Sequence, residues 1–185
     1  MSLLLYYYLV HFLADYTFQP SRLVRYKSEH FLGVVIHSSV HLLILLIVLA
    51  PFLPDNKVQA TIAVIYVTHI LIDQSKIMLS RMYPKYTRFL YFLDQAVHIL
   101  IVTACSYYVG SLTPKYLTGT ALALYADQSV VLYLLLLVLV TYFFDVSRYF
   151  VKQEYKKGPF KRDWRTMGIN AGIVTIAFGI YWLGC

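Results

Sequence analysis

Charged residues are scarce in this sequence, and their scarcity excludes an ordinary soluble domain. Only 14% of the 185 residues are charged and 59% are hydrophobic, whereas soluble domains have about 25% charged and about 45–50% apolar residues. A single core of this size cannot bury so much apolar surface, so we expect lipid to cover part of it. Cysteine is equally sparse, since Cys105 and Cys185 form no CxxC pair and no disulfide framework.

Several sequence signals are also missing. The N-terminus has no basic n-region and no small-residue cleavage site, so we expect residues 2–18 to remain as a first span rather than to be removed as a signal peptide. No GxSxG nucleophile motif and no aromatic–basic surface for nucleic acid is visible. The net charge of +7 is therefore more typical of loops beside anionic lipid. We expect membrane lipids as partners; a homo-oligomer is compatible with the sequence, and no specific protein partner can be inferred.

Six apolar stretches are each close to the ~20 residues that a helix needs to cross the hydrocarbon core. They cover residues 2–18, 31–53, 58–79, 88–110, 128–150 and 166–184. The sequence therefore predicts an all-α fold, a polytopic membrane helix bundle with about six transmembrane helices in one domain, residues 1–185. Residues 115–127, which follow Pro114, are predicted to form a short interfacial helix.

Positive charge alternates between the connecting loops. All but two of the 16 basic residues lie in or beside the first, third and fifth loops, the exceptions being Lys57 and Lys115. The fifth loop has the largest share: Arg148, Lys152, Lys156, Lys157, Lys161, Arg162 and Arg165. By the positive-inside rule, the three basic loops face the cytoplasm and both termini lie on the outer side.

Four of the predicted spans each carry two ionisable residues spaced four apart. These pairs are His11 and Asp15, His37 and His41, His69 and Asp73, and Asp94 and His98. Residues i and i+4 share one face of a helix, and all eight groups fall in the half of the membrane next to the basic loops. Ionisable groups at such depths pair with one another, line water or bind ions, because an isolated charge there is costly.

We interpret all eight residues as ligands of a divalent metal. Mixed histidine and aspartate ligation favours zinc, with manganese or iron(II) as alternatives. Asp94 and Asp15 are the candidate catalytic residues, as general bases. Gln19, Lys27, Lys76 and Gln95 lie at the mouth of the cluster and are candidates for binding a substrate phosphate. A structural or proton-conducting network remains the alternative.

These motifs resemble a family of small bacterial membrane proteins known as domain of unknown function 3307. The resemblance spans roughly residues 8–105 and implies a multi-pass protein of the bacterial inner (cytoplasmic) membrane. It is carried by His11-Phe-Leu-Ala-Asp15 with Gln19, Lys27 ten residues before His37, His69-Ile-Leu-Ile-Asp73, and Asp94-Gln95-Ala-Val-His98. A looser similarity to membrane-bound metal-dependent hydrolases implies their reaction type by analogy.

The sequence thus favours a metal-dependent hydrolase that acts on a lipid or phosphate-containing substrate at the cytoplasmic leaflet. A divalent-cation or proton transporter or channel is one alternative, but no inverted repeat is visible between the halves of the chain. A di-iron lipid-modifying enzyme is another, although the sequence has no HxxHH motif.

Overall fold

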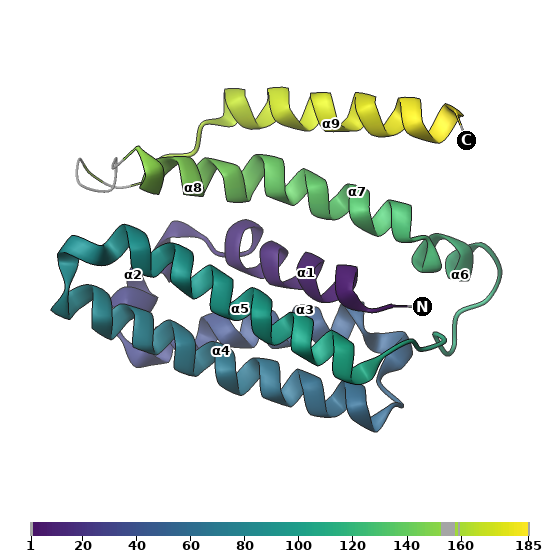
Figure 1. The fold of residues 1–185 in the computed structure, drawn as a ribbon, viewed down its shortest axis with the longest axis horizontal. Helices are drawn as coiled ribbons and strands as arrows, with labels where there is room; N and C mark the ends of the chain where they lie inside the picture. Colours follow the sequence, from purple (N-terminus) through teal and green to yellow (C-terminus); the bar gives the residue numbers. More distant parts are fainter. Residues whose placement is uncertain (1, 153–157, 159, 185) are drawn as a thin grey trace.

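The computed structural model describes residues 2–152, 158 and 160–184, all of them helical or irregular apart from one isolated bridge between Ser2 and Ser111. Lys156, Lys157 and Cys185 lie outside the described residues. In chain order the α-helices are α1 (Leu4–Phe12), α2 (Ser21–Glu29), α3 (Phe31–Val48), α4 (Asn56–Met82), α5 (Thr87–Val109), α6 (Gly119–Ala126), α7 (Gln128–Val138), α8 (Phe144–Val151) and α9 (Trp164–Gly184) (Figure 1).

Within this described part, five segments are long and apolar enough to cross a membrane, and the chain is a multi-pass membrane protein. The five are Phe31–Val48, Asn56–Met82, Pro84–Val109, Gln128–Val151 and Trp164–Gly184. They correspond to five of the six predicted spans. The fourth of them joins α7 to α8 through a π-helical turn, Leu139–Phe143. The predicted interfacial helix over 115–127 is present as α6.

The first predicted span, residues 2–18, is the exception. Here α1 ends at Phe12 and continues as a single π-helical turn, Leu13–Thr17. At 1.5 Å per residue these two pieces together extend only about 21 Å, short of the ~30 Å hydrocarbon core. The segment forms the centre of the bundle, with α3, α5 and α7 packed around it, and whether it crosses the membrane as a sixth span stays a prediction. Its Tyr7 and Val10 are each only 1% exposed, and every residue of α1 is buried or half-buried.

A close approach between two helices brings a lysine into the bundle. A Cβ atom at Gly33, near the start of α3, would lie only 2.5 Å from the backbone nitrogen of Lys27 in α2. Only glycine leaves room for the two backbones at this separation. Because α2 lies so close to α3, Lys27 is 8% exposed although it belongs to a short helix rich in polar residues.

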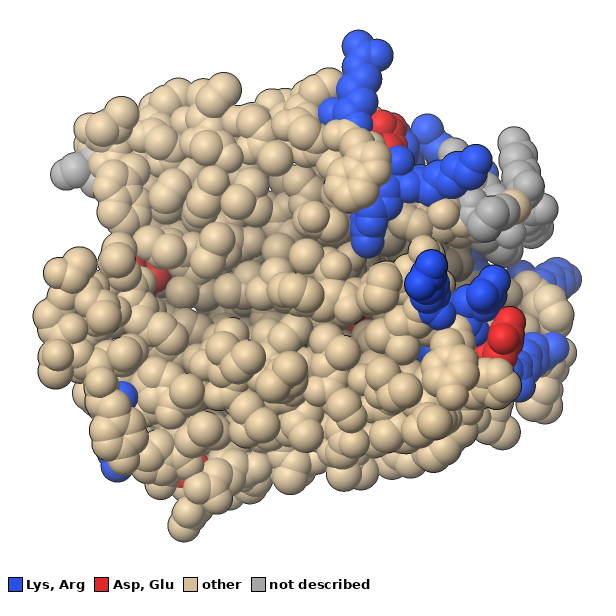
Figure 2. Space-filling view, turned by 180° about the vertical axis from the view of Figure 1, so that it is seen from behind, with Lys and Arg blue, Asp and Glu red and all other residues tan. Residues whose placement is uncertain are grey.

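Positive charge gathers at one end of the bundle. The two termini lie at the opposite end from α2 and the α8–α9 connection (Figure 1). Figure 2 shows lysine and arginine side chains concentrated at the end that carries these two segments. This arrangement matches the predicted alternation of basic loops; which side of the membrane each end faces stays a prediction.

Candidate metal centre

All eight predicted ligands come together in the interior of the bundle. Their ligand atoms form three groups that could hold a metal ion, and within each group the atoms lie within 4.8 Å of one another. The groups are Asp15, His37, His41 and His69; then His11, His69 and His98; and finally Asp73, Asp94 and His98. Because His69 and His98 each belong to two groups, the three groups form one continuous cluster. All its members are buried except Asp15, whose exposure is intermediate.

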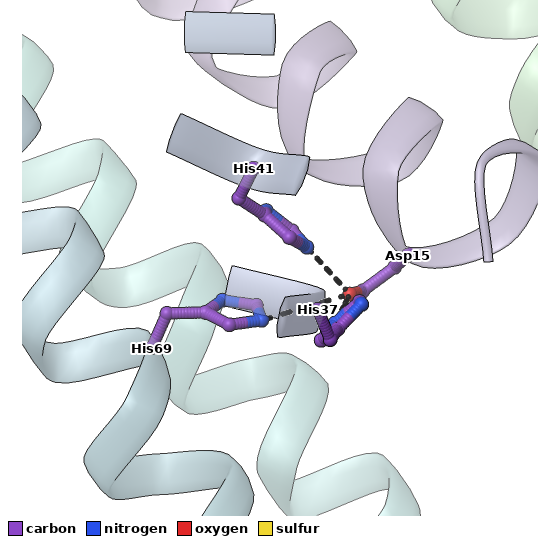
Figure 3. A group of neighbouring side chains, drawn as sticks. All are labelled: Asp15, His37, His41 and His69. Carbon is purple, nitrogen blue, oxygen red and sulfur yellow. Dashed lines mark hydrogen bonds and ion pairs between the residues drawn. The ribbon is translucent and has the colours of Figure 1, made fainter. Parts of the chain in front are cut away.

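The Asp15 carboxylate lies at the centre of the first group. Its Oδ1 atom is 2.9 Å from His41 Nε2, 3.0 Å from His37 Nε2 and 3.8 Å from His69 Nε2. Figure 3 shows the three imidazoles pointing at this carboxylate from α3 and α4. A tetrahedral ion with bonds of ~2.1 Å holds its ligands about 3.4 Å apart. The three spacings to Asp15 lie close to this value, and all four ligand atoms of the group lie within 4.8 Å of one another, so they would have to draw together only where a spacing exceeds it.

Asp15 is presented by the π-helical turn that follows α1. The backbone N–H of Phe18 donates to the carbonyl of Leu13, five residues earlier, at 2.9 Å. Such turns are rare and occur frequently at functional sites, because they change the direction in which a side chain points. Asp15 still lies 3.7 Å from His11, measured from Oδ2 to Nε2. The spacing of the motif in the sequence contained no sign of this turn.

Three imidazole nitrogens are buried with no hydrogen-bond partner among the described residues. They are the Nε2 atoms of His11, His69 and His98, and an unsatisfied buried polar group costs about 1–3 kcal/mol. The rings are also crowded: the centroid of His69 is 3.8 Å from that of His41 and 4.3 Å from that of His98. Protonating several of these rings would bring like charges together, whereas neutral imidazoles can all donate lone pairs to a cation.

Gln19 orients one of the ligands. With its amide oxygen toward α3, Gln19 accepts hydrogen bonds from His37 Nδ1 at 3.1 Å and from Lys27 Nζ at 2.8 Å, and its nitrogen donates to the Asp15 carbonyl at 3.0 Å. A proton on Nδ1 leaves the lone pair of His37 on Nε2, the atom that faces Asp15. Histidine ligands in metal sites are commonly oriented by such a partner.

Both predicted substrate-binding lysines lie against carboxylates of the cluster. Lys27 Nζ is 2.9 Å from Asp73 Oδ2, and Lys76 Nζ is 3.0 Å from Asp94 Oδ2 and 3.8 Å from Asp73 Oδ1. Sequence reasoning missed these ion pairs. The i,i+3 spacing of Asp73 and Lys76 was a usable signal, but nothing in the sequence connected Lys27 to a residue 46 positions away. Binding of a substrate phosphate by either lysine stays a prediction.

The fixed charges of the cluster do not balance. Asp15, Asp73 and Asp94 carry three negative charges against the two positive charges of the lysines, so with neutral imidazoles one negative charge remains. Gln95 reduces the repulsion between two of the carboxylates, because its Nε2 donates to Asp94 Oδ2 at 3.0 Å and to Asp15 Oδ2 at 3.2 Å. A buried net charge is costly, and either a bound cation or one protonated imidazole would offset it.

A cleft connects the cluster to the basic end of the molecule. It has a volume of about 1450 Å³ and is lined at its inner end by Asp15, Gln19, Lys27, Lys76 and Gln95. The four residues predicted to bind substrate therefore all line the cleft beside the candidate metal ligands. On the opposite side of the cluster, a cavity of about 10 Å³ is lined by four of the histidines: His11, His41, His69 and His98. This smaller space is about the size of one water molecule.

The fold and the site together define a class: a multi-pass membrane protein with a buried His/Asp cluster that could bind metal. The chain belongs to the family described as Protein of unknown function (DUF3307), whose family model matches residues 3–121. The match extends the resemblance seen in the motifs at both ends and contains all eight candidate ligands. No curated protein and no solved structure matches the chain. The similarity to metal-dependent hydrolases thus gains no support from named relatives.

Proposed function

We propose that this protein is a metal-dependent hydrolase that acts on a phosphate-containing lipid at the cytoplasmic leaflet, with zinc as its metal. The observation that carries the proposal is the convergence of His37, His41 and His69 on the Asp15 carboxylate at 2.9–3.8 Å. Three histidines and one carboxylate match the ligands that zinc prefers. Manganese and iron(II) accept the same ligands, and the remaining carboxylates and histidines leave room for a second ion.

The contacts of the two candidate catalytic carboxylates support different roles for them. Asp15 Oδ1 is surrounded by imidazole nitrogens, which favours Asp15 as a ligand. Asp94 Oδ2 is held by Lys76 and Gln95, each at 3.0 Å, while its Oδ1 atom has no hydrogen-bond partner in the described structure. Asp94 Oδ1 lies 3.6 Å from His98 Nε2, beyond hydrogen-bond distance, and so keeps a lone pair with which it can accept a proton. Asp94 is therefore our candidate for the general base.

Hydrolysis of a phosphate ester needs a water, a base and stabilisation of negative charge. The water oxygen forms a bond to phosphorus, the bond from phosphorus to the alcohol oxygen breaks, and the proton removed from water by Asp94 passes to the leaving alcohol. A metal at the cluster would polarise the phosphate and acidify water. Lys76, beside Asp94 and on the wall of the cleft, would neutralise charge that develops on the phosphate.

Metal content and turnover, measured on detergent-purified protein, test the proposal. Mass spectrometry of the wild type should find zinc, manganese or iron, and His41→Ala should lose it. His30→Ala is the matched control, because His30 lies outside the cluster and is exposed. Asp94→Asn should retain metal but release phosphate from a lipid phosphomonoester at least ~10²-fold more slowly. A wild type that takes up no metal on reconstitution, or a fully active Asp94→Asn variant, would contradict the proposal.

Ion or proton transport is the second candidate. It is favoured by the placement of the cluster between the cleft and the small cavity lined by histidines, which puts space on both sides of the ligands. Tyr7, which lines that cavity, is joined to Thr61 by a 2.5 Å hydrogen bond between their hydroxyls. Zinc or proton flux into proteoliposomes that is abolished by His69→Ala would establish transport in place of hydrolysis.

A further inference from the structure

The C-terminal part of the chain, beyond the family match, forms one wall of the cleft. The matched segment ends at residue 121, whereas the cleft is also lined by Tyr142, Val146 and Phe150 from the α7–α8 span and by Arg162 and Trp164 at the start of the last span. The ligands of the cluster thus come from the family segment, and this wall comes from residues outside it. Such a wall is suited to select what enters.

Arg162 joins this wall to the segment that presents Asp15. Its Nη2 donates to the backbone carbonyl of Tyr16 at 2.7 Å, one residue after Asp15, and its guanidinium carbon lies 4.8 Å from the centroid of the Tyr142 ring. Its Nη1 atom is buried and has no hydrogen-bond partner among the described residues. A stacked guanidinium whose Nη1 has no partner is suited to donate a hydrogen bond to a phosphate oxygen.

The segment that carries Arg162 is fixed by the next residue. Asp163 Oδ2 lies 2.7 Å from Arg148 Nη2, and Asp163 also accepts hydrogen bonds from the Thr166 hydroxyl and backbone N–H. The bonds from Thr166, together with Arg148, lower the pKa of Asp163 to about 2. The carboxylate therefore stays charged at neutral pH and holds the start of α9 against α8, which keeps Arg162 over the cleft.

Charge along the cleft favours an anion. Besides Lys27 and Lys76, which pair with carboxylates, the lining contains Arg22, Arg25 and Lys161 with Arg162. No carboxylate of the described chain lies within ion-pair distance of these last four. Asp15 is the only acidic residue among the described residues that line the cleft. An anionic group that enters the cleft from the basic end would thus meet arginine and lysine side chains that have no carboxylate partner in the described chain.

The remaining lining is apolar. Phe18, Val24 and Trp164 line the cleft and are 53%, 45% and 66% exposed. The volume of about 1450 Å³ also exceeds the roughly 300–1,000 Å³ typical of sites for small ligands. An apolar lip and this much space suit a molecule with an acyl chain, whereas free phosphate would leave most of the cleft unfilled.

We propose that the cleft binds a lipid with an anionic phosphate headgroup, that Arg162 holds its phosphate, and that its chain lies along Tyr142, Val146 and Phe150. The inference rests on the proposed function, whose substrate class it narrows to anionic lipids. It also assigns the selection of substrate to the part of the chain beyond the family match. Arg162 thereby becomes a substrate-binding residue that the motifs of the family segment do not include.

Native mass spectrometry of the full chain in detergent tests the binding directly. We expect phosphatidic acid to bind at least ~10-fold more tightly than phosphatidylcholine with the same chains, and Arg162→Gln to weaken its binding by about 10-fold, the effect of losing one charge-assisted hydrogen bond. Lys115→Gln, which removes an exposed positive charge at the other end, should change nothing. Equal binding of both lipids, or no effect of Arg162→Gln, would overturn the proposal. Displacement of the lipid by an equal concentration of inorganic phosphate would overturn the role of the chain.

Photo-crosslinking of the wild type provides a test that needs no variant. Phosphatidic acid with a diazirine on its acyl chain should label peptides that contain residues 142–150 or 160–164. Labelling confined to the outer face of α9 would contradict the placement of the chain. Lipid binding by a protein that takes up no metal would refute hydrolysis and leave the lipid site standing. Metal uptake and cleavage of soluble phosphate esters without lipid binding would refute the lipid site alone.

Discussion

The sharpest test of the metal centre is the substitution Asp15→Asn. Asparagine keeps the shape of the side chain but removes the negative charge on which His37 and His41 converge at 3.0 and 2.9 Å. Structural zinc sites with four ligands contribute roughly 10–16 kcal/mol of apparent binding free energy. If the four ligands contribute equally, loss of one removes about 2.5–4 kcal/mol, which weakens zinc binding by roughly 10²–10³-fold.

A competition titration with a zinc chelator in detergent measures this change. Asp145→Asn is the matched control, since Asp145 is also a buried carboxylate within a membrane span, 5% exposed, but lies outside the cluster. We expect Asp145→Asn to bind zinc like the wild type. Size-exclusion chromatography and thermal unfolding show whether both variants are folded.

Zinc binding by folded Asp15→Asn with the affinity of the wild type would refute this role of Asp15. In that case the ion would have to be held by the other two groups of the cluster, around His98. If neither protein bound zinc and Asp15→Asn mainly lowered the melting temperature, the Asp15–histidine contacts would belong to a hydrogen-bonded network without metal.

Three further substitutions test the surroundings of the site. Gly33→Ala should destabilise the protein by about 1–3 kcal/mol in thermal unfolding, because the added Cβ cannot fit. Gly172→Ala is the control and should not destabilise it, because a Cβ there meets open space. Equal melting temperatures of the two variants would contradict the close packing of α2. Lys27→Met should destabilise the protein by less than the about 3–5 kcal/mol of a buried charge left without any partner, because Asp73 loses Lys27 at 2.9 Å but keeps Lys76 at 3.8 Å, and adding Asp73→Asn should recover most of that loss in the same assay. Gln19→Leu should weaken zinc binding by about 10–100-fold through the orientation of His37, and an unchanged chelator titration would exclude that role.

The architecture could be predicted from the sequence because it depends on local properties. Hydropathy over ~20 residues marks a span whatever its neighbours are, so five spans agree with the apolar stretches. The i,i+4 pairs identified the faces of four helices, and the alternation of basic loops indicated that those pairs lie at one depth. Together these two local patterns were enough to nominate all eight members of the cluster.

The first segment shows what hydropathy alone leaves open. Residues 2–18 are as apolar as a span, but their apolar character reflects burial among other helices rather than contact with lipid. Hydropathy cannot distinguish these two environments, because apolar side chains are favoured in both of them. The π-helical turn that presents Asp15 was equally invisible, since the spacing of His11 and Asp15 is the one expected for an uninterrupted helix.

Only the tertiary structure decided which groups face each other across helices. That Lys27 pairs with Asp73, that Gln95 joins two carboxylates and that Arg162 lies over Tyr142 all follow from how the helices pack. These contacts join residues far apart in the chain, and a sequence contains no periodicity that encodes such distances. The sequence by itself therefore determined a membrane bundle with a candidate metal cluster. The packing decided which carboxylates pair with the two lysines and which cations line the cleft.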